Sequence, residues 1–233
     1  MSFPRLVRSV VDWVFPPTCA GCGKEGEIFC SECLASIIPI KQPTCRYCGL
    51  SLAKAGICTH CLEVEHPYAE MASYAVYAGN LRSGIHALKY QNNFWLGEVF
   101  SNLLVQLLKE KKWPIDIVMP IPLSEERLQE RGYNQAALLS KPIAKYLNRQ
   151  HDQQSLVRVK ENHSQVALTR EQRFENVRSA FLAESPKQSN LNVLLVDDVF
   201  TTGATIMEAS KALAAAGYGN IYAVTLAKAS TGY

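Results

Sequence analysis

Two patterns of apolar and polar residues divide the chain near residue 66. After this point, short apolar runs alternate with longer segments whose apolar residues recur every three or four positions. The short runs predict strands and the longer segments predict helices. The expected strands are Ala72–Tyr77, Ile115–Met119, Leu156–Val159, Leu191–Val196 and Ile221–Leu226, and the expected helices are Leu81–Tyr90, Gly97–Lys109, Asn134–Leu147 and Gly203–Ala216. This alternation predicts an α/β fold, with a mostly parallel sheet and helices on both faces.

Proline and glycine mark several ends of these elements. Pro120 stops the strand before it, and Gly217 closes the last helix. Pro142 falls inside the segment Asn134–Leu147, where it is expected either to kink the helix or to divide it in two.

The first sixteen residues predict a short amphipathic helix, with Arg5 and Arg8 on its polar side. Its apolar side can dock on the protein's own core, or make a weak contact with a membrane surface or a partner. Arg8 and Asp12 interrupt the apolar residues, which is unlike a secretory signal. No apolar run reaches the about 20 residues that a membrane span needs. A soluble, cytoplasmic protein is therefore expected.

Composition narrows the class of protein only in part. A hydrophobic fraction of 48% in 233 residues supports one ordinary domain with a real core, plus a smaller module. Lys and Arg outnumber Asp and Glu by 24 to 21. This surplus is too slight to indicate nucleic-acid binding, which only a local basic surface could do.

All eight cysteines lie in the first part of the chain, as four CxxC pairs. The pairs are Cys19 and Cys22, Cys30 and Cys33, Cys45 and Cys48, and Cys58 and Cys61. Two thiolates at this spacing can bind one metal ion from a tight turn, and tetrahedral zinc needs two such turns. The pairs therefore predict two Zn²⁺ sites in a double zinc ribbon at residues 17–66. Four disulfides in a secreted domain are the alternative, which the lack of a signal sequence and of other cysteines disfavours.

The sequence does not decide which pairs share an ion. Sequential pairing closes the shorter loops and is favoured, whereas pairing the first with the third remains possible. An all-cysteine set leaves no open position for water, which predicts structural sites, although His60 could replace a ligand. So small a module needs the metal to fold. It could dock nucleic acid or protein, or only brace the next domain.

The stretch VLLVDDVFTTGAT, at residues 193–205, joins an apolar strand to two acids and a hydroxyl-rich loop. Asp197 and Asp198 are expected where the strand ends, and the carboxyl ends of parallel strands form the ligand site in such sheets. The loop Thr201, Thr202, Gly203, Ala204, Thr205 then opens a helix whose free N–H groups favour an anion. Carboxylates beside an anion cradle suit the hydroxyls and 5-phosphate of a ribose phosphate. Alternatively the acids only cap a helix, which leaves one of them unexplained.

This stretch resembles, at every position, the phosphoribosyl pyrophosphate (PRPP) motif of type I phosphoribosyltransferases. Together with HALKY, IVMPIPLSEERLQERGYNQA and HSQVALTREQRFENVRSAF, in that order, it resembles the ComF (ComFC/GntX-like) family. The cysteine pairs resemble the double zinc ribbon of that family. The resemblance implies a type I phosphoribosyltransferase-like domain over residues 67–233.

The resemblance also implies roles for the residues of this motif. Asp197 and Asp198 would hold the ribose hydroxyls of PRPP or a ribonucleotide, with Mg²⁺ bridging hydroxyls and pyrophosphate. The loop at residues 201–205 would hold the 5-phosphate.

A second loop, Met119–Ser124, would then lie beside the pyrophosphate. Arg127 and Arg131, one helical turn apart, are candidates to meet its charge, and residues 132–135 would complete the site. Asp197, Asp198 and Arg131 are the candidate catalytic residues.

A further segment would close over the substrate by the same resemblance. Its candidate residues are Gln165, Arg170, Arg173 and Asn176. Such a basic lid would exclude water and offset phosphate charge. A solvated helix face is the alternative for Arg170 and Arg178.

Three functions remain open from the sequence. The favoured one, implied by the resemblance, is natural transformation or DNA utilisation, with handling of single-stranded DNA beside a helicase-like ATPase. Tyr90, Phe94 and Trp95 could stack on bases, although such aromatics are more often in the core. The basic residues that would support this function are Arg82, Lys89, Arg127, Arg131, Lys141, Lys145, Arg149 and Lys160. The second is a phosphoribosyltransferase acting on a small amine or nucleobase, although no base-recognising segment is evident. The third is a zinc-stabilised scaffold with a relic site.

Overall fold

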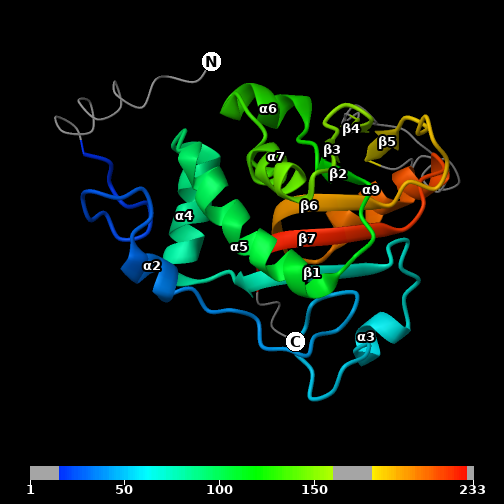
Figure 1. The fold of residues 1–233 in the computed structure, drawn as a ribbon, viewed down its shortest axis with the longest axis horizontal. Helices are drawn as coiled ribbons and strands as arrows, with labels where there is room; N and C mark the ends of the chain where they lie inside the picture. The colour runs from blue at the N-terminus through cyan, green and yellow to red at the C-terminus, as the bar shows by residue number, and fades with distance from the viewer. Residues whose placement is uncertain (1–15, 160–179, 230–233) are drawn as a thin grey trace, which may run out of the picture.

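A five-stranded sheet forms the centre of the computed structural model, which describes residues 16–159 and 180–229 (Figure 1). All neighbouring strands are parallel, in the order β1-β7-β6-β2-β3. The strands are β1 (Glu70–Val76), β2 (Ile117–Pro120), β3 (Gln150–His151), β6 (Val193–Phe200) and β7 (Ile221–Lys228). The continuous apolar runs of β6 and β7 are buried because helices cover both faces. The predicted α/β fold class is confirmed.

Two hydrophobic cores separate the helices by face. Helices α4 (Gly79–Tyr90), α5 (Trp95–Lys111) and α7 (Gln135–Leu147) pack on one face with the even-numbered residues Leu194 and Val196. Helix α9 (Ala204–Ala215) packs on the other face with Val193 and Leu195. The short helix α6 (Glu125–Arg131) lies between β2 and α7 in the chain.

The structure corrects the predicted end of the fourth strand. Strand β6 does not stop at Val196 but continues through both acids to Phe200. The reason is its neighbour β7, which runs alongside and pairs Asp197 with Thr225 and Phe200 with Lys228. The acids therefore lie within the strand, ahead of its last residues.

Three further details differ from the expected elements. Helix α7 is one unbroken helix through Pro142. The edge strand β3 has only two residues and was not predicted. The predicted strand near residue 156 is β4 (Leu156–Arg158), which pairs antiparallel with β5 (Phe181–Ala183) in a separate two-stranded sheet.

The cysteine-rich segment covers the outer edge of β1, the edge that has no strand neighbour in the sheet. It contains the short helices α2 (Ser31–Ala35) and α3 (Thr59–Leu62), and in Figure 1 it runs beneath β1 from α2 to α3. The backbone N–H groups of Ile40 and Val76 pair the segment at residues 38–40 with β1, at 3.0 and 2.9 Å from the oxygens of Tyr74 and Ile38. A covered edge cannot pair with another chain.

Two expectations fall on residues that the structure does not describe. They are the amphipathic helix at 1–16, apart from Pro16, and the lid residues Gln165, Arg170, Arg173, Asn176 and Arg178. Among the described helices, none combines the length and the apolar character that crossing a membrane requires.

Candidate functional site

The eight cysteines form two clusters of four, in sequence order. Cys19, Cys22, Cys30 and Cys33 make the first, and Cys45, Cys48, Cys58 and Cys61 make the second, with the four sulfur atoms of each within 4.8 Å of one another. This arrangement is sequential pairing, as favoured from the loop lengths. Four sulfurs at this spacing fit a tetrahedral Zn²⁺ ion and leave no coordination position for water. Both clusters are structural metal sites.

Backbone N–H groups prepare one thiol in each cluster to bind metal. Burial alone would raise the pKa of Cys19, but N–H donors, foremost that of Cys30 at 3.2 Å, outweigh it and lower the pKa to about 6. The same balance holds for Cys45. Burial would raise its pKa, but N–H donors, foremost that of Cys58 at 3.3 Å, lower the pKa to about 7. Thiolate is the form that zinc binds.

The candidate ligand site lies where β2 ends beside Val196 of β6, just before the two acids. From β2 the chain passes through α7 to β3, whereas from β6 it passes through α9 to β7 on the opposite side. Open α/β sheets bind ligands at such a reversal of strand order. The backbone N–H of Ile121 donates to the oxygen of Val196 at 2.9 Å, so the loop after β2 begins beside Asp197.

The two acids differ in their surroundings. Asp198 is buried, and its Oδ2 lies 2.5 Å from Nζ of Lys89 in α4. Because side chains alternate along a strand, Asp197 faces the other side, and its Oδ1 accepts a hydrogen bond from the N–H of Asp198 at 2.8 Å. Burial, and then the charge of Asp198, raises the pKa of Asp197 well above its usual value. Asp198 is therefore paired with a cation, whereas Asp197 resists ionisation.

The loop after β6 has a backbone shape that only glycine fits. Gly203 has φ of +85°, and a Cβ atom there would lie 2.8 Å from the ring of Phe200. Helix α9 starts at the next residue, and the hydroxyl of Thr202 accepts from the N–H of Ala204 at 3.4 Å. Thr201 and Thr202 are exposed. The first turn of α9 thus presents N–H groups beside hydroxyl side chains.

Arg131 joins the end of α6 to the end of α4. Its Nη2 donates to the Tyr90 hydroxyl at 2.9 Å and its Nη1 to Oε1 of Gln135 at 3.0 Å. Its guanidinium also lies 4.7 Å from the centre of the Tyr90 ring. These contacts place Arg131 beside the residue that follows Lys89. Arg127 is exposed on α6, with no side-chain partner within the described residues.

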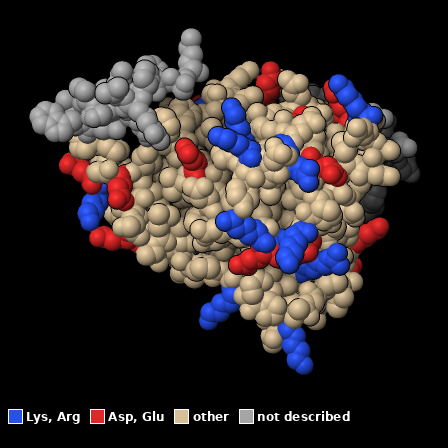
Figure 2. Space-filling model, in the orientation of Figure 1, with Lys and Arg blue, Asp and Glu red and all other residues tan. Residues whose placement is uncertain are grey.

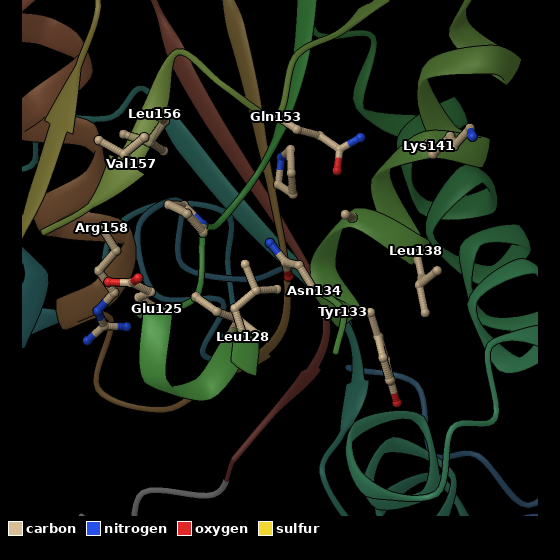
Figure 3. Close-up of a pocket in the computed structure, with 14 residues that line it drawn as sticks. Glu125, Leu128, Tyr133, Asn134, Leu138, Lys141, Gln153, Leu156, Val157 and Arg158 are labelled. Atoms are coloured by element: carbon tan, nitrogen blue, oxygen red, sulfur yellow. The ribbon is translucent and has the colours of Figure 1, made fainter. Parts of the chain in front are cut away.

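A pocket of about 620 Å³ opens beside the loop after β2 (Figure 3). Its wall is largely apolar and includes Leu128, Leu138 and Leu156, with the amides of Asn134 and Gln153 among its polar groups. Asn134 is fixed there, since its Nδ2 donates to the oxygen of Ile121 at 2.9 Å. The pocket has the size and lining of a small-molecule site.

Sequence reasoning did not assign Lys89 to this site. The available signal was its spacing, because Leu81, Ile85 and Lys89 follow one another at four-residue intervals along the apolar stripe of α4. A lysine in that stripe needs a buried acid. The aromatics Tyr90, Phe94 and Trp95 are 53%, 47% and 52% exposed, so they lie at the surface and not in the core.

The comparisons with known proteins agree with these features. Residues 10–62 match the model of the double zinc ribbon domain. Over 219 residues the chain is 33% identical to competence protein F of Haemophilus influenzae, covering 91% of this chain and 90% of that protein. The chain belongs to the ComF family. Other relatives are the DNA utilization protein YhgH of Salmonella typhimurium, at 32% identity over 79% and 83% of the two chains, and ComFC of Bacillus subtilis, at 26% over 82% and 79%.

Solved structures similar to this ComF protein include phosphoribosyltransferases. Glutamine PRPP amidotransferase from B. subtilis matches with a TM-score of 0.42 and 16% identity, over 56% of this chain and 26% of that chain. Adenine phosphoribosyltransferase from Thermoanaerobacter pseudethanolicus matches with a TM-score of 0.35 and 14% identity, over 60% and 83%.

Proposed function

We propose that this ComF protein binds a ribose phosphate such as PRPP, with Mg²⁺, where β2 and β6 end. We further propose that it serves DNA uptake or utilisation in the cytoplasm by handling single-stranded DNA, together with a helicase-like ATPase. The names of its relatives, competence protein F and DNA utilization protein, support the role in DNA. Zinc-binding thiolates suit a reducing compartment.

One observation supports the ligand most directly. Asp197 and Asp198 precede, in the same chain segment, a glycine in the left-handed region and the first turn of a twelve-residue helix. Carboxylates accept hydrogen bonds from sugar hydroxyls, and free N–H groups at a helix start bind phosphate. Both halves of a ribose phosphate therefore have a partner.

The state of Asp197 also fits a bound cation. Its pKa is raised because burial and the charge of Asp198 disfavour ionisation. A Mg²⁺ ion bound with the ribose phosphate would supply positive charge near this carboxylate, and Arg131 would meet the pyrophosphate.

Calorimetric titration with PRPP, with and without Mg²⁺, tests this proposal. We expect Mg²⁺-dependent binding that the double substitution Asp197→Asn with Asp198→Asn weakens at least about tenfold, since two charge-assisted contacts are lost. The matched control is Glu63→Gln with Glu110→Gln, which removes the same charge at exposed positions in the ribbon and in the last turn of α5. Equal affinity of the site variant and the control would contradict the proposal.

Phosphoribosyl transfer is the second candidate function, and the pocket beside Asn134 favours it. A small amine or nucleobase could occupy this pocket next to the proposed pyrophosphate loop. The test is release of pyrophosphate from PRPP in the presence of nucleobases and small amines. Enzymatic release should vanish in the Asp197→Asn, Asp198→Asn variant. Release that continues in that variant would assign the reaction to a contaminant or to another site.

A further inference from the structure

We propose that single-stranded DNA binds to a basic ridge at the C-terminal ends of α5 and α7. These helix ends lie at the opposite end of the parallel strands from Asp197. The ridge consists of Lys109, Lys112, Lys145, Tyr146 and Arg149. This inference rests on the proposed function, for which it names the surface that contacts DNA.

The two helix ends lie together because α5 and α7 pack side by side in the same direction. Near the start of α5, a Cβ atom on Gly97 would lie 2.8 Å from Cβ of Leu138 in α7. Near the end of α5, Nζ of Lys109 lies 5.4 Å from the centre of the Tyr146 ring in α7. The ridge therefore spans both helices.

The ridge and the ligand site lie at opposite ends of the parallel strands. The chain enters β2 shortly after α5 ends and enters β3 shortly after α7 ends. Helix ends that lead into parallel strands lie at the amino edge of the sheet, whereas Asp197 lies toward the carboxyl edge. A strand of DNA on the ridge would leave the ribose-phosphate site open.

The cations of the ridge form no ion pair with any acid in the described parts of the chain. Lys111 provides the contrast, since its Nζ lies 2.6 Å from Glu70 and it contacts Trp113. Within residues 16–159 and 180–229, none of the four ridge cations has an acidic partner; these cations are Lys109, Lys112, Lys145 and Arg149. Helix α7 itself contains no acidic residue. Figure 2 shows Lys and Arg side chains, with several Asp and Glu side chains among them, on the face that α5 and α7 build.

The helix dipole explains only part of this arrangement. A lysine in the last turn offsets the negative end of a helix, which accounts for Lys109 and Lys145 taken singly. It does not account for Tyr146, which is 52% exposed. Nor does it explain Lys112, which ends α5 in the left-handed conformation, at φ of +50°, where glycine is usual.

An exposed aromatic ring among unpaired cations fits single-stranded DNA better than a duplex or an acidic peptide. Cations track the phosphates, and the ring can stack on an unpaired base of any sequence. Of the other exposed aromatics, Tyr90 accepts a hydrogen bond from Arg131 as well as its cation contact, and Phe94 packs on Tyr133. Tyr146 contacts Lys109 alone among the described cations. Because Tyr146 is 52% exposed, a base can stack on its ring beside Lys109.

Fluorescence anisotropy with a labelled oligo-dT across a salt series tests the ridge. Charge reversal by Lys109→Glu with Lys145→Glu should raise Kd at least about tenfold at low salt and reduce the slope of log Kd against log salt by about 1.4, or 0.7 for each phosphate contact. Lys187→Glu with Lys211→Glu, which makes the same change in net charge elsewhere, should have a much smaller effect. Tyr146→Ala should raise Kd about fivefold or more, whereas Tyr146→Phe should not.

The outcomes separate this inference from the proposed function. Wild-type protein that binds no oligo-dT would overturn the DNA-handling role and the ridge with it. Wild-type binding that the ridge and control reversals reduce equally would overturn the ridge alone, as would loss confined to Lys24→Glu with Lys54→Glu in the ribbons. Saturating PRPP and Mg²⁺ should leave the DNA Kd within about twofold, and displacement of DNA would place the strand in the ribose-phosphate site. Unchanged zinc content and unfolding midpoint verify that each variant is folded.

Discussion

Nζ of Lys89 lies 2.5 Å from Oδ2 of Asp198, and this ion pair ties helix α4 to strand β6 under the candidate site. The side chains are only 20% and 5% exposed, so water screens the pair little. The contact makes the motif HALKY part of the same site as the two acids. It also gives Asp198 a structural role besides any contact with ligand.

Replacement of Lys89 by methionine should destabilise the protein. The change leaves the buried Asp198 carboxylate without a cation, and we expect a loss of about 3 kcal/mol in the free energy of unfolding, the lower end for a buried pair. Urea unfolding measures this loss. Arg82→Met, on the exposed side of the same helix, is the control and should cost less than about 1 kcal/mol. Adding Asp198→Asn to Lys89→Met should restore part of the stability, and an additive further loss would show that the pair is not coupled.

Neutral pH should destabilise the protein through Asp197. The pKa of this carboxyl is raised in the folded state, so the folded protein holds a proton that the unfolded chain releases above about pH 3.9. Stability from this group is therefore present in acid and is lost as pH rises through the folded pKa. Asp197→Asn should be more stable than wild type at pH 8, with a smaller difference at pH 5, as measured by urea unfolding at both. An asparagine variant that is equally destabilised at the two pH values would contradict the raised pKa.

Removal of zinc should unfold the ribbon and uncover the edge of β1. Metal analysis should find two Zn²⁺ ions for each chain, and Cys33→Ser or Cys61→Ser should each reduce this to about one. Because the segment at residues 38–40 pairs with β1, its release would expose unpaired backbone groups of that strand. Light scattering after chelation should therefore show association of chains. A clear solution of metal-free protein would mean that the edge stays covered without zinc.

Gly203→Ala should weaken ribose-phosphate binding and reduce stability. Alanine at φ of +85° is strained, and its Cβ would contact the Phe200 ring at 2.8 Å, so a loss of about 2–3 kcal/mol is expected. Gly217→Ala is a matched control, since Gly217 has φ of +96° but no heavy atom within 4 Å of the added Cβ. It should lose only about 1 kcal/mol and keep its affinity for PRPP. Equal affinity of the two variants for PRPP would show that the loop does not bind the phosphate.

The sequence by itself determined the features that depend on local spacing. CxxC pairs predict zinc ligands because two thiolates in one turn already reach a common ion. The apolar run of residues 193–196 predicts a buried strand, and the order of strands and helices predicts a parallel sheet. The motif at residues 193–205 placed the two acids and the glycine beside one another, since they are neighbours in the chain.

The tertiary structure decided what depends on contacts between distant segments. The partner of Asp198 is Lys89, more than a hundred positions away, and no local pattern pairs them. The length of β6 follows from its ladder with β7, which overrides the polar residues that predicted its end. The wrapping of the ribbon around β1 and the meeting of Lys109 with Tyr146 have the same cause. Such contacts arise only when the sheet brings separate helices and strands together, and packing, rather than local preference, then fixes which side chains meet.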